Sequence, residues 1–280
     1  MTTPSSDRDT TTATGSRPDF LRLPERTTKP RRLGVTHVLD NGMPLAEVEQ
    51  RLTTNADSID IWKFGWGTAY VDPALDAKLA LLREHTVLAC TGGTLLEVAW
   101  RDGAARQLME WARRVGFPCM EVSCGTIAIP REAKSQLIRS TADHFTVLAE
   151  VGAKDPRSPV TPAGWAEDAA ADRDAGAAWV VTEGRESGTV GLFDPSGEVR
   201  AEVAQAVVDA VGLETVLFEA PRRAQQGWLI RRYGANTNLG NISPAEVLAV
   251  ETLRLGLRSD TMPQWPSTEG DLAGGPGGAG

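Results

Sequence analysis

The chain has 280 residues, of which 41% are hydrophobic and 24% are charged, as in a globular protein with a sizeable core. Its formal net charge of −8 argues against a nucleic-acid partner and requires a locally positive pocket for any small anionic substrate. No apolar run reaches the ~20 residues of a membrane span, and the cysteines lack metal-site spacing, so we expect no membrane partner and a reduced, cytoplasmic protein.

Polar segments flank the part of the chain that we expect to fold. Residues 1–30 are rich in Thr, Ser, Asp, Arg and Pro, and residues 262–280 end in a Gly- and Pro-rich run. Neither composition offsets the entropy lost on ordering, so we predict that both segments are disordered. Residues 31–261 remain as a single folded domain, close to the ~250 residues typical of a TIM barrel.

Short apolar runs alternate with longer amphipathic stretches along this domain. We predict eight strands, in chain order at Leu33–Leu39, Ser58–Phe64, Thr86–Cys90, Phe117–Val122, Phe145–Glu150, Ala178–Glu183, Val216–Glu219 and Thr237–Leu239. A helical stretch follows each of them, and Pro44, Pro73 and Pro130 stand where three of these helices open. Eight such units predict an α/β fold, the (β/α)8 TIM barrel. The alternative is an open doubly wound sheet, which the absence of a GxGxxG motif and a P-loop disfavours.

Acidic residues lie at or just beyond the predicted strand ends, where barrel active sites form. They are Asp40, Glu97, Glu121, Glu150, Glu183 and Glu219. Carboxylates in this arrangement can hold Mg²⁺, which prefers oxygen ligands. The alternative is that several of them form structural salt bridges. We predict a metal site, with Asp40, Glu121 and Glu183 as its ligands.

Lys63 and Lys154 are the strongest individual candidates for a functional role. A lysine at the end of a buried strand must satisfy its charge, so it binds an anion, donates a proton or pairs with neighbouring glutamates. We take both lysines, together with Glu150, as catalytic candidates. Trp66, between two glycines, is the tryptophan that we expect to line a pocket, whereas His37 in mid-strand reads as a packed core residue.

Two later segments have the composition of anion-binding turns. The run from Gly184 to Gly188 combines glycines with an arginine, and the segment around Gly240 precedes a helix start. Barrels often hold phosphate in the loops after their seventh and eighth strands. We therefore predict the following substrate-binding residues: Arg185, Ser187, Gly188, Asn238, Gly240 and Asn241.

Together these stretches resemble the phosphosulfolactate synthase family, which also contains plant heat-stress-associated relatives. The matching pieces follow one another through the predicted domain: VLDNGMP, IDIWKFGWGT, GGTLLE, GFPCMEVSCGT, VLAEVGAKDP, TEGRESGT, FEAPRRAQQ, NTNLGNI and ETLRLGLRSDT. The resemblance implies a Mg²⁺-dependent barrel that adds sulfite to phosphoenolpyruvate, giving (2R)-phospho-3-sulfolactate. It also implies that Lys154 is the general acid and that Lys63, Arg185 and Arg223 hold anionic groups.

The chain departs from the family pattern at several strand ends. Asn41 and Ala153 replace lysines, Cys124 replaces an aspartate, and Arg223 replaces a lysine. Because arginine cannot act as a compact proton donor, these changes keep two alternatives open. One is a relative that adds another nucleophile to a phosphoenolpyruvate-like substrate, and the other is a non-catalytic stress or scaffold protein. A homo-oligomer is compatible with the sequence.

Overall fold

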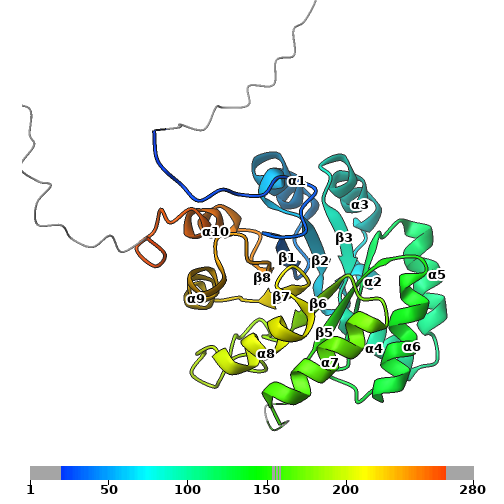
Figure 1. The fold of residues 1–280 in the computed structure, drawn as a ribbon. Helices are drawn as coiled ribbons and strands as arrows, with labels where there is room; N and C mark the ends of the chain where they lie inside the picture. The colour runs from blue at the N-terminus through cyan, green and yellow to red at the C-terminus, as the bar shows by residue number, and fades with distance from the viewer. Residues whose placement is uncertain (1–19, 153–154, 156, 158, 263–280) are drawn as a thin grey trace, which may run out of the picture.

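The protein is a closed barrel of eight parallel strands in sequential order, as predicted (Figure 1). The computed structural model describes residues 20–152, 155, 157 and 159–262. The strands are β1 (Thr36–Asp40), β2 (Ile61–Phe64), β3 (Leu88–Thr91), β4 (Cys119–Val122), β5 (Thr146–Val151), β6 (Trp179–Thr182), β7 (Val216–Glu219) and β8 (Leu239–Ile242). Pairing of β8 with β1 as well as β7 closes the barrel.

Helices surround the barrel, one or two after each strand (Figure 1). They are α1 (Leu45–Asn55), α2 (Thr68–Val71), α3 (Leu75–Glu84), α4 (Gly93–Arg101), α5 (Ala105–Val115), α6 (Arg131–Ala142), α7 (Pro162–Asp174), α8 (Ala201–Val211), α9 (Arg223–Tyr233) and α10 (Val247–Arg254). Local signals explain several ends: Pro44 and Pro130 immediately precede α1 and α6, and Gly116 ends α5 with a left-handed φ of 98°. None of the helices in the described ranges has the length and apolar composition needed to cross a membrane.

The strand period of two sorts the inward-facing residues of the barrel into layers. One layer is apolar and fully buried, and it includes Ile61, Cys119, Leu148 and Leu217. Two positions further along the same strands stand Lys63, Glu121, Glu150 and Glu219. The apolar layer therefore lies directly beneath a layer of charged side chains at the carboxyl ends of the strands.

At the opposite, amino-terminal end of the barrel, arginine side chains form hydrogen bonds and ion pairs. Arg254 is fully buried and donates to the carbonyl oxygens of Val35, Ala235 and Thr237, and burial lowers its pKa to about 9. Part of the segment that the sequence predicts to be disordered contacts this end: Arg26 pairs with Glu251 at 2.8 Å, and the Thr27 hydroxyl donates to the carbonyl oxygen of Leu33. The rest of the two predicted disordered segments, residues 1–19 and 263–280, lies outside the described residues.

Candidate active site

A cavity of about 210 Å³ opens at the carboxyl ends of the strands. Its wall combines two cationic residues, five glutamates and several polar residues with Trp66, which was predicted to line a pocket. The lining residues are Leu39, Lys63, Gly65, Trp66, Gly92, Gly93, Thr94, Glu121, Thr126, Glu150, Glu183, Arg185, Glu186, Glu219 and Asn241. Every strand contributes one of its last residues or its following loop. This is the position at which barrel enzymes carry their catalytic groups.

Lys63 lies at the centre of this charged layer. Its Nζ donates to Oε2 of Glu121 at 2.9 Å and to Oε1 of Glu219 at 3.0 Å, and only 6% of the side chain is exposed. Burial alone would lower the pKa of Lys63, but the charges of Glu121, Glu219 and Glu150 outweigh it and raise this pKa well above its ordinary value. Lys63 is therefore an ammonium ion.

The second oxygen of each of these two carboxylates is held by the backbone. Oε1 of Glu121 accepts from the amide N–H of Gly93 at 2.8 Å, at the start of α4. Oε2 of Glu219 accepts from the amides of Gly184 at 2.9 Å and Arg185 at 3.1 Å. These charge-assisted bonds fix the orientation of both carboxylates and keep their remaining oxygens directed at Lys63.

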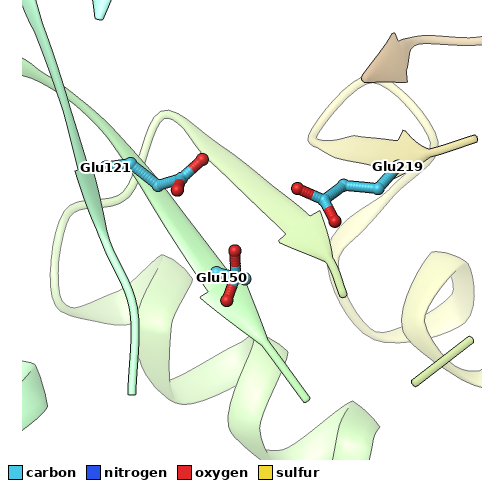
Figure 2. Close-up of side chains that lie close together, drawn as sticks. All are labelled: Glu121, Glu150 and Glu219. Carbon is cyan, nitrogen blue, oxygen red and sulfur yellow. The ribbon is translucent and has the colours of Figure 1, made fainter. Parts of the chain in front are cut away.

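Glu150 completes a cluster of three buried carboxylates. Glu121, Glu150 and Glu219 each offer an oxygen that lies within 4.8 Å of the other two. Figure 2 shows the three side chains converging from separate strands. Among the described residues this is the group whose spacing suits a metal ion. The carboxylate oxygens match what Mg²⁺ prefers, and Glu121 is the predicted ligand that the cluster contains.

The other two predicted metal ligands lie outside this cluster. Glu183 lines the cavity, and its Oε1 accepts from the amide of Arg185 at 2.8 Å. Asp40 turns away from the cavity: its oxygens accept from the amides of Gly42 and Met43 and from the indole N–H of Trp62 at 3.0 Å. Asp40 thus shapes the turn after β1.

The predicted substrate-binding residues separate into two groups. Arg185 and Asn241 line the cavity, both with a left-handed backbone, at φ 50° and 54°. The side-chain Oδ1 of Asn241 is buried, with no hydrogen-bond partner among the described residues. Gly240, just before it, lets β8 pack against Leu217 and His37, because a Cβ there would collide with the Leu217 side chain and lie 3.1 Å from Nδ1 of His37.

The remaining predicted residues lie away from the cavity wall. Asn238 is buried at the amino-terminal end of β8, where Oδ1 accepts from the amide of Val35 at 2.9 Å. Ser187 bonds to Thr189, and the carbonyl of Gly188 accepts from Gln225. The Arg223 side chain is 62% exposed, near Asp260. Lys154, the predicted general acid, lies outside the described residues.

Two features of the site carried no signal in the sequence. His37 is buried as predicted, yet it also touches the site: its Nδ1 accepts from the amide of Asn241 at 3.3 Å, and burial and then the charge of Lys63 lower its pKa well below the ordinary value. Lys134 on α6 is buried and donates to the carbonyl oxygen of Glu150 at 2.7 Å and to Asp172. A lysine in an amphipathic helix reads as a surface residue, so only the packing reveals this contact.

Known proteins match this chain over nearly its whole length. The family model described as (2R)-phospho-3-sulfolactate synthase (ComA) matches residues 24–260. The phosphosulfolactate synthase of Bacillus subtilis (strain 168) is 38% identical over 247 residues, covering 87% of this chain and 98% of its own. Protein HEAT-STRESS-ASSOCIATED 32 of Arabidopsis thaliana is 24% identical, covering 84% of this chain and 90% of its own.

Solved structures that resemble this one are barrel proteins with little sequence in common. The YdjI aldolase of Escherichia coli K12 aligns with a TM-score of 0.54 at 14% identity over 78% of both chains. A 3-hexulose-6-phosphate synthase aligns with a TM-score of 0.54 at 13% identity, over 79% of this chain and 99% of its own. These likenesses concern the fold alone, whereas the sequence matches are specific. The chain belongs to the (2R)-phospho-3-sulfolactate synthase family.

Proposed function

We propose that this lyase-type enzyme adds sulfite to the methylene carbon of phosphoenolpyruvate, giving (2R)-phospho-3-sulfolactate, in a Mg²⁺-dependent reaction. The observation that carries the proposal is the cluster of Lys63, Glu121, Glu150 and Glu219 in the barrel mouth of a chain 38% identical to phosphosulfolactate synthases. A buried ammonium and buried carboxylates in one cavity can stabilise charge that develops during a reaction.

The charge of the cavity supports the need for a metal ion. Its described wall carries five glutamates against two cations, Lys63 and Arg185, so it is acidic on its own. Phosphoenolpyruvate brings a phosphate and a carboxylate, and sulfite is a further anion. A divalent cation held by Glu121, Glu150 and Glu219 would offset most of this negative charge. The Lys63 ammonium bridges two of these carboxylates and supplies positive charge where such a cation would bind.

The proposed reaction forms one C–S bond and one C–H bond. The lone pair on the sulfur of sulfite attacks the methylene carbon, and the π electrons move onto C2 and the carboxylate as an enediolate. When bound, Mg²⁺ would supply positive charge to that enediolate. Arg185 and Lys63 bind and orient the anionic groups of the substrates. A proton then adds to C2 with the phosphate ester intact, and we assign this transfer to Lys154 from the family resemblance.

The direct test is ³¹P NMR of the purified protein with phosphoenolpyruvate, sulfite and Mg²⁺. We expect a new phosphate-ester resonance that requires sulfite and is lost in a Lys154→Ala variant. A Glu219→Gln variant should form it more slowly at a limiting Mg²⁺ concentration, because the charge of the carboxylate cluster falls. If phosphoenolpyruvate stays unchanged under all conditions, sulfite addition is rejected.

A second candidate keeps the enol substrate but changes the nucleophile. The residue that favours this candidate is Asn41, which stands where the family pattern has a lysine. Asn41 lies next to Gly65 of the cavity wall: a Cβ added at Gly65 would lie 2.8 Å from Oδ1 of Asn41. A neutral amide therefore lies beside a residue of the cavity wall. Calorimetry with phosphoenolpyruvate and Mg²⁺ separates the readings, because binding without reaction with sulfite supports another nucleophile, and no binding supports a scaffold.

A further inference from the structure

We propose, resting on the function above, that the Lys63 ammonium and the divalent cation compete for the same carboxylate oxygens. Entry of the cation detaches Lys63 from Glu121 and Glu219 and frees its ammonium to bind the anionic substrate. Lys63 then has two successive partners, the carboxylate cluster before the metal binds and the substrate afterwards.

The competition follows from how the four oxygens of Glu121 and Glu219 are used. The backbone amides of Gly93, Gly184 and Arg185 engage one oxygen of each carboxylate. Lys63 bonds to the other oxygen of each, Oε2 of Glu121 and Oε1 of Glu219. A second cation that binds these two oxygens therefore competes with the ammonium.

The two cations are too close to be bound together at this point. Lys63 Nζ is 2.9 Å and 3.0 Å from its two carboxylate oxygens, and Mg²⁺ would sit at about 2.0–2.1 Å from its ligands. An ion between oxygens that already flank the ammonium would be nearly in contact with it, and like charges at such a distance repel strongly. Lysine has a flexible four-carbon stem, so its head group can move into the cavity while the carboxylates stay fixed by the backbone.

A second, independent feature indicates that this cavity takes a ligand. Asn241 is 7% exposed and lines the same cavity, and its side-chain Oδ1 lacks a hydrogen-bond partner among the described residues. Its backbone is held in the left-handed region at φ 54°, with its amide bonded to His37. A buried carboxamide kept in a strained conformation at a cavity wall is typical of a binding site.

Lys63 also explains how the cluster persists before a metal binds. Three carboxylates whose oxygens lie within 4.8 Å of one another repel. The ammonium neutralises part of this charge and holds an oxygen of Glu121 and of Glu219 in place. The metal therefore meets a preorganised set of ligands, and it should bind before the anionic substrate does.

The experiment measures Mn²⁺ binding by the electron paramagnetic resonance signal of the free ion, for the full chain and three variants. Lys63→Met removes the competing charge, and we expect its Kd for Mn²⁺ to fall at least tenfold below that of the unaltered protein. Lys63→Arg keeps the competing charge, and its planar guanidinium can bond to both carboxylates, so we expect its Kd for Mn²⁺ to rise above that of the unaltered protein. Lys78→Met is the matched control, because Lys78 is a buried lysine that pairs with Asp72 and Asp40 outside the cavity.

Each outcome bears on the inference. A Kd for Lys63→Met equal to or above that of the unaltered protein would overturn the competition while leaving the metal site intact, and so would an unchanged Kd for Lys63→Arg. If neither the unaltered protein nor Lys63→Met binds Mn²⁺, the metal dependence of the proposed function fails as well. Should Lys63→Met fold only with Mn²⁺ present, as followed by circular dichroism, the ion has taken the place of the ammonium and the inference stands.

Discussion

The buried ion pair of Lys134 and Asp172 allows a prediction that separates stability from function. Their side chains are 6% and 4% exposed, and Lys134 also donates to the carbonyl oxygen of Glu150 at 2.7 Å. Replacing Lys134 by Met leaves a buried carboxylate without its counter-charge, which costs about 3–5 kcal/mol. The unpaired carbonyl adds about 1–3 kcal/mol.

The double variant Lys134→Met/Asp172→Leu removes both charges at once. Because well-packed apolar side chains can replace a buried ion pair with little loss, we expect it to recover most of the stability. It should nevertheless keep a raised KM for Mg²⁺, since the strand end that carries Glu150 is no longer tethered to α6. Urea denaturation gives the free energies of unfolding, and steady-state assays give the KM.

Two results would refute this reasoning. One is a loss of less than about 1 kcal/mol in Lys134→Met, which would mean that the pair is not desolvated. The other is a double variant with unchanged Mg²⁺ dependence, which would mean that Lys134 does not act through Glu150.

The same pair predicts a pH dependence of stability. Burial raises the pKa of the Asp172 carboxyl above its ordinary value, although Lys134 opposes this. A carboxyl whose pKa is raised on folding stabilises the folded state below its unfolded pKa, and that contribution is lost as the pH rises through the folded pKa. Without Lys134 the pKa rises further, so the deficit of Lys134→Met should shrink as the pH falls from 7 toward 4. A deficit independent of pH would contradict this.

Three further predictions concern other parts of the barrel. Gly93→Ala would push a methyl group into Ser123 and toward Glu121. We expect thermal unfolding to show a free energy of unfolding lower by about 1–3 kcal/mol, and activity assays to show weaker activation by Mg²⁺. Unchanged values would show that α4 can shift freely. Glu219→Gln should raise the KM for Mg²⁺ at least tenfold in steady-state assays, and an unchanged KM would remove Glu219 from the metal site. Arg254→Met leaves buried carbonyls unpaired, so urea denaturation should show a loss of about 3 kcal/mol or more with normal KM values; a stable variant would count against this.

Much of the fold and part of the site follow from local sequence. The alternation of apolar runs and amphipathic stretches predicts eight strand–helix units, because burial on both faces demands nearly continuous apolar strands. Charged residues at the ends of such runs must then lie at one end of the barrel. This reasoning predicts Lys63, Glu121 and Glu150, and the glycine-rich turn after β6 predicts Arg185; all four line the cavity.

The eighth strand shows where local reasoning fails. The sequence predicts it at Thr237–Leu239, whereas β8 is Leu239–Ile242. A Leu-Gly-Asn run has low strand propensity, but pairing with β1 and β7 recruits it into the closed barrel. The shift moves Asn238 to the amino-terminal end and Asn241 to the cavity.

The sequence alone determined which charged residues stand at strand ends, because the strand period and the position of each residue in its apolar run are local properties. Only the tertiary structure decided how they pair. Lys63 on β2 meets Glu121 on β4 and Glu219 on β7, strands that are not its neighbours, while Asp40 turns to Trp62. These partners lie across the barrel and far apart in the chain, so their contacts depend on closure of the barrel and on the backbone amides that orient each carboxylate.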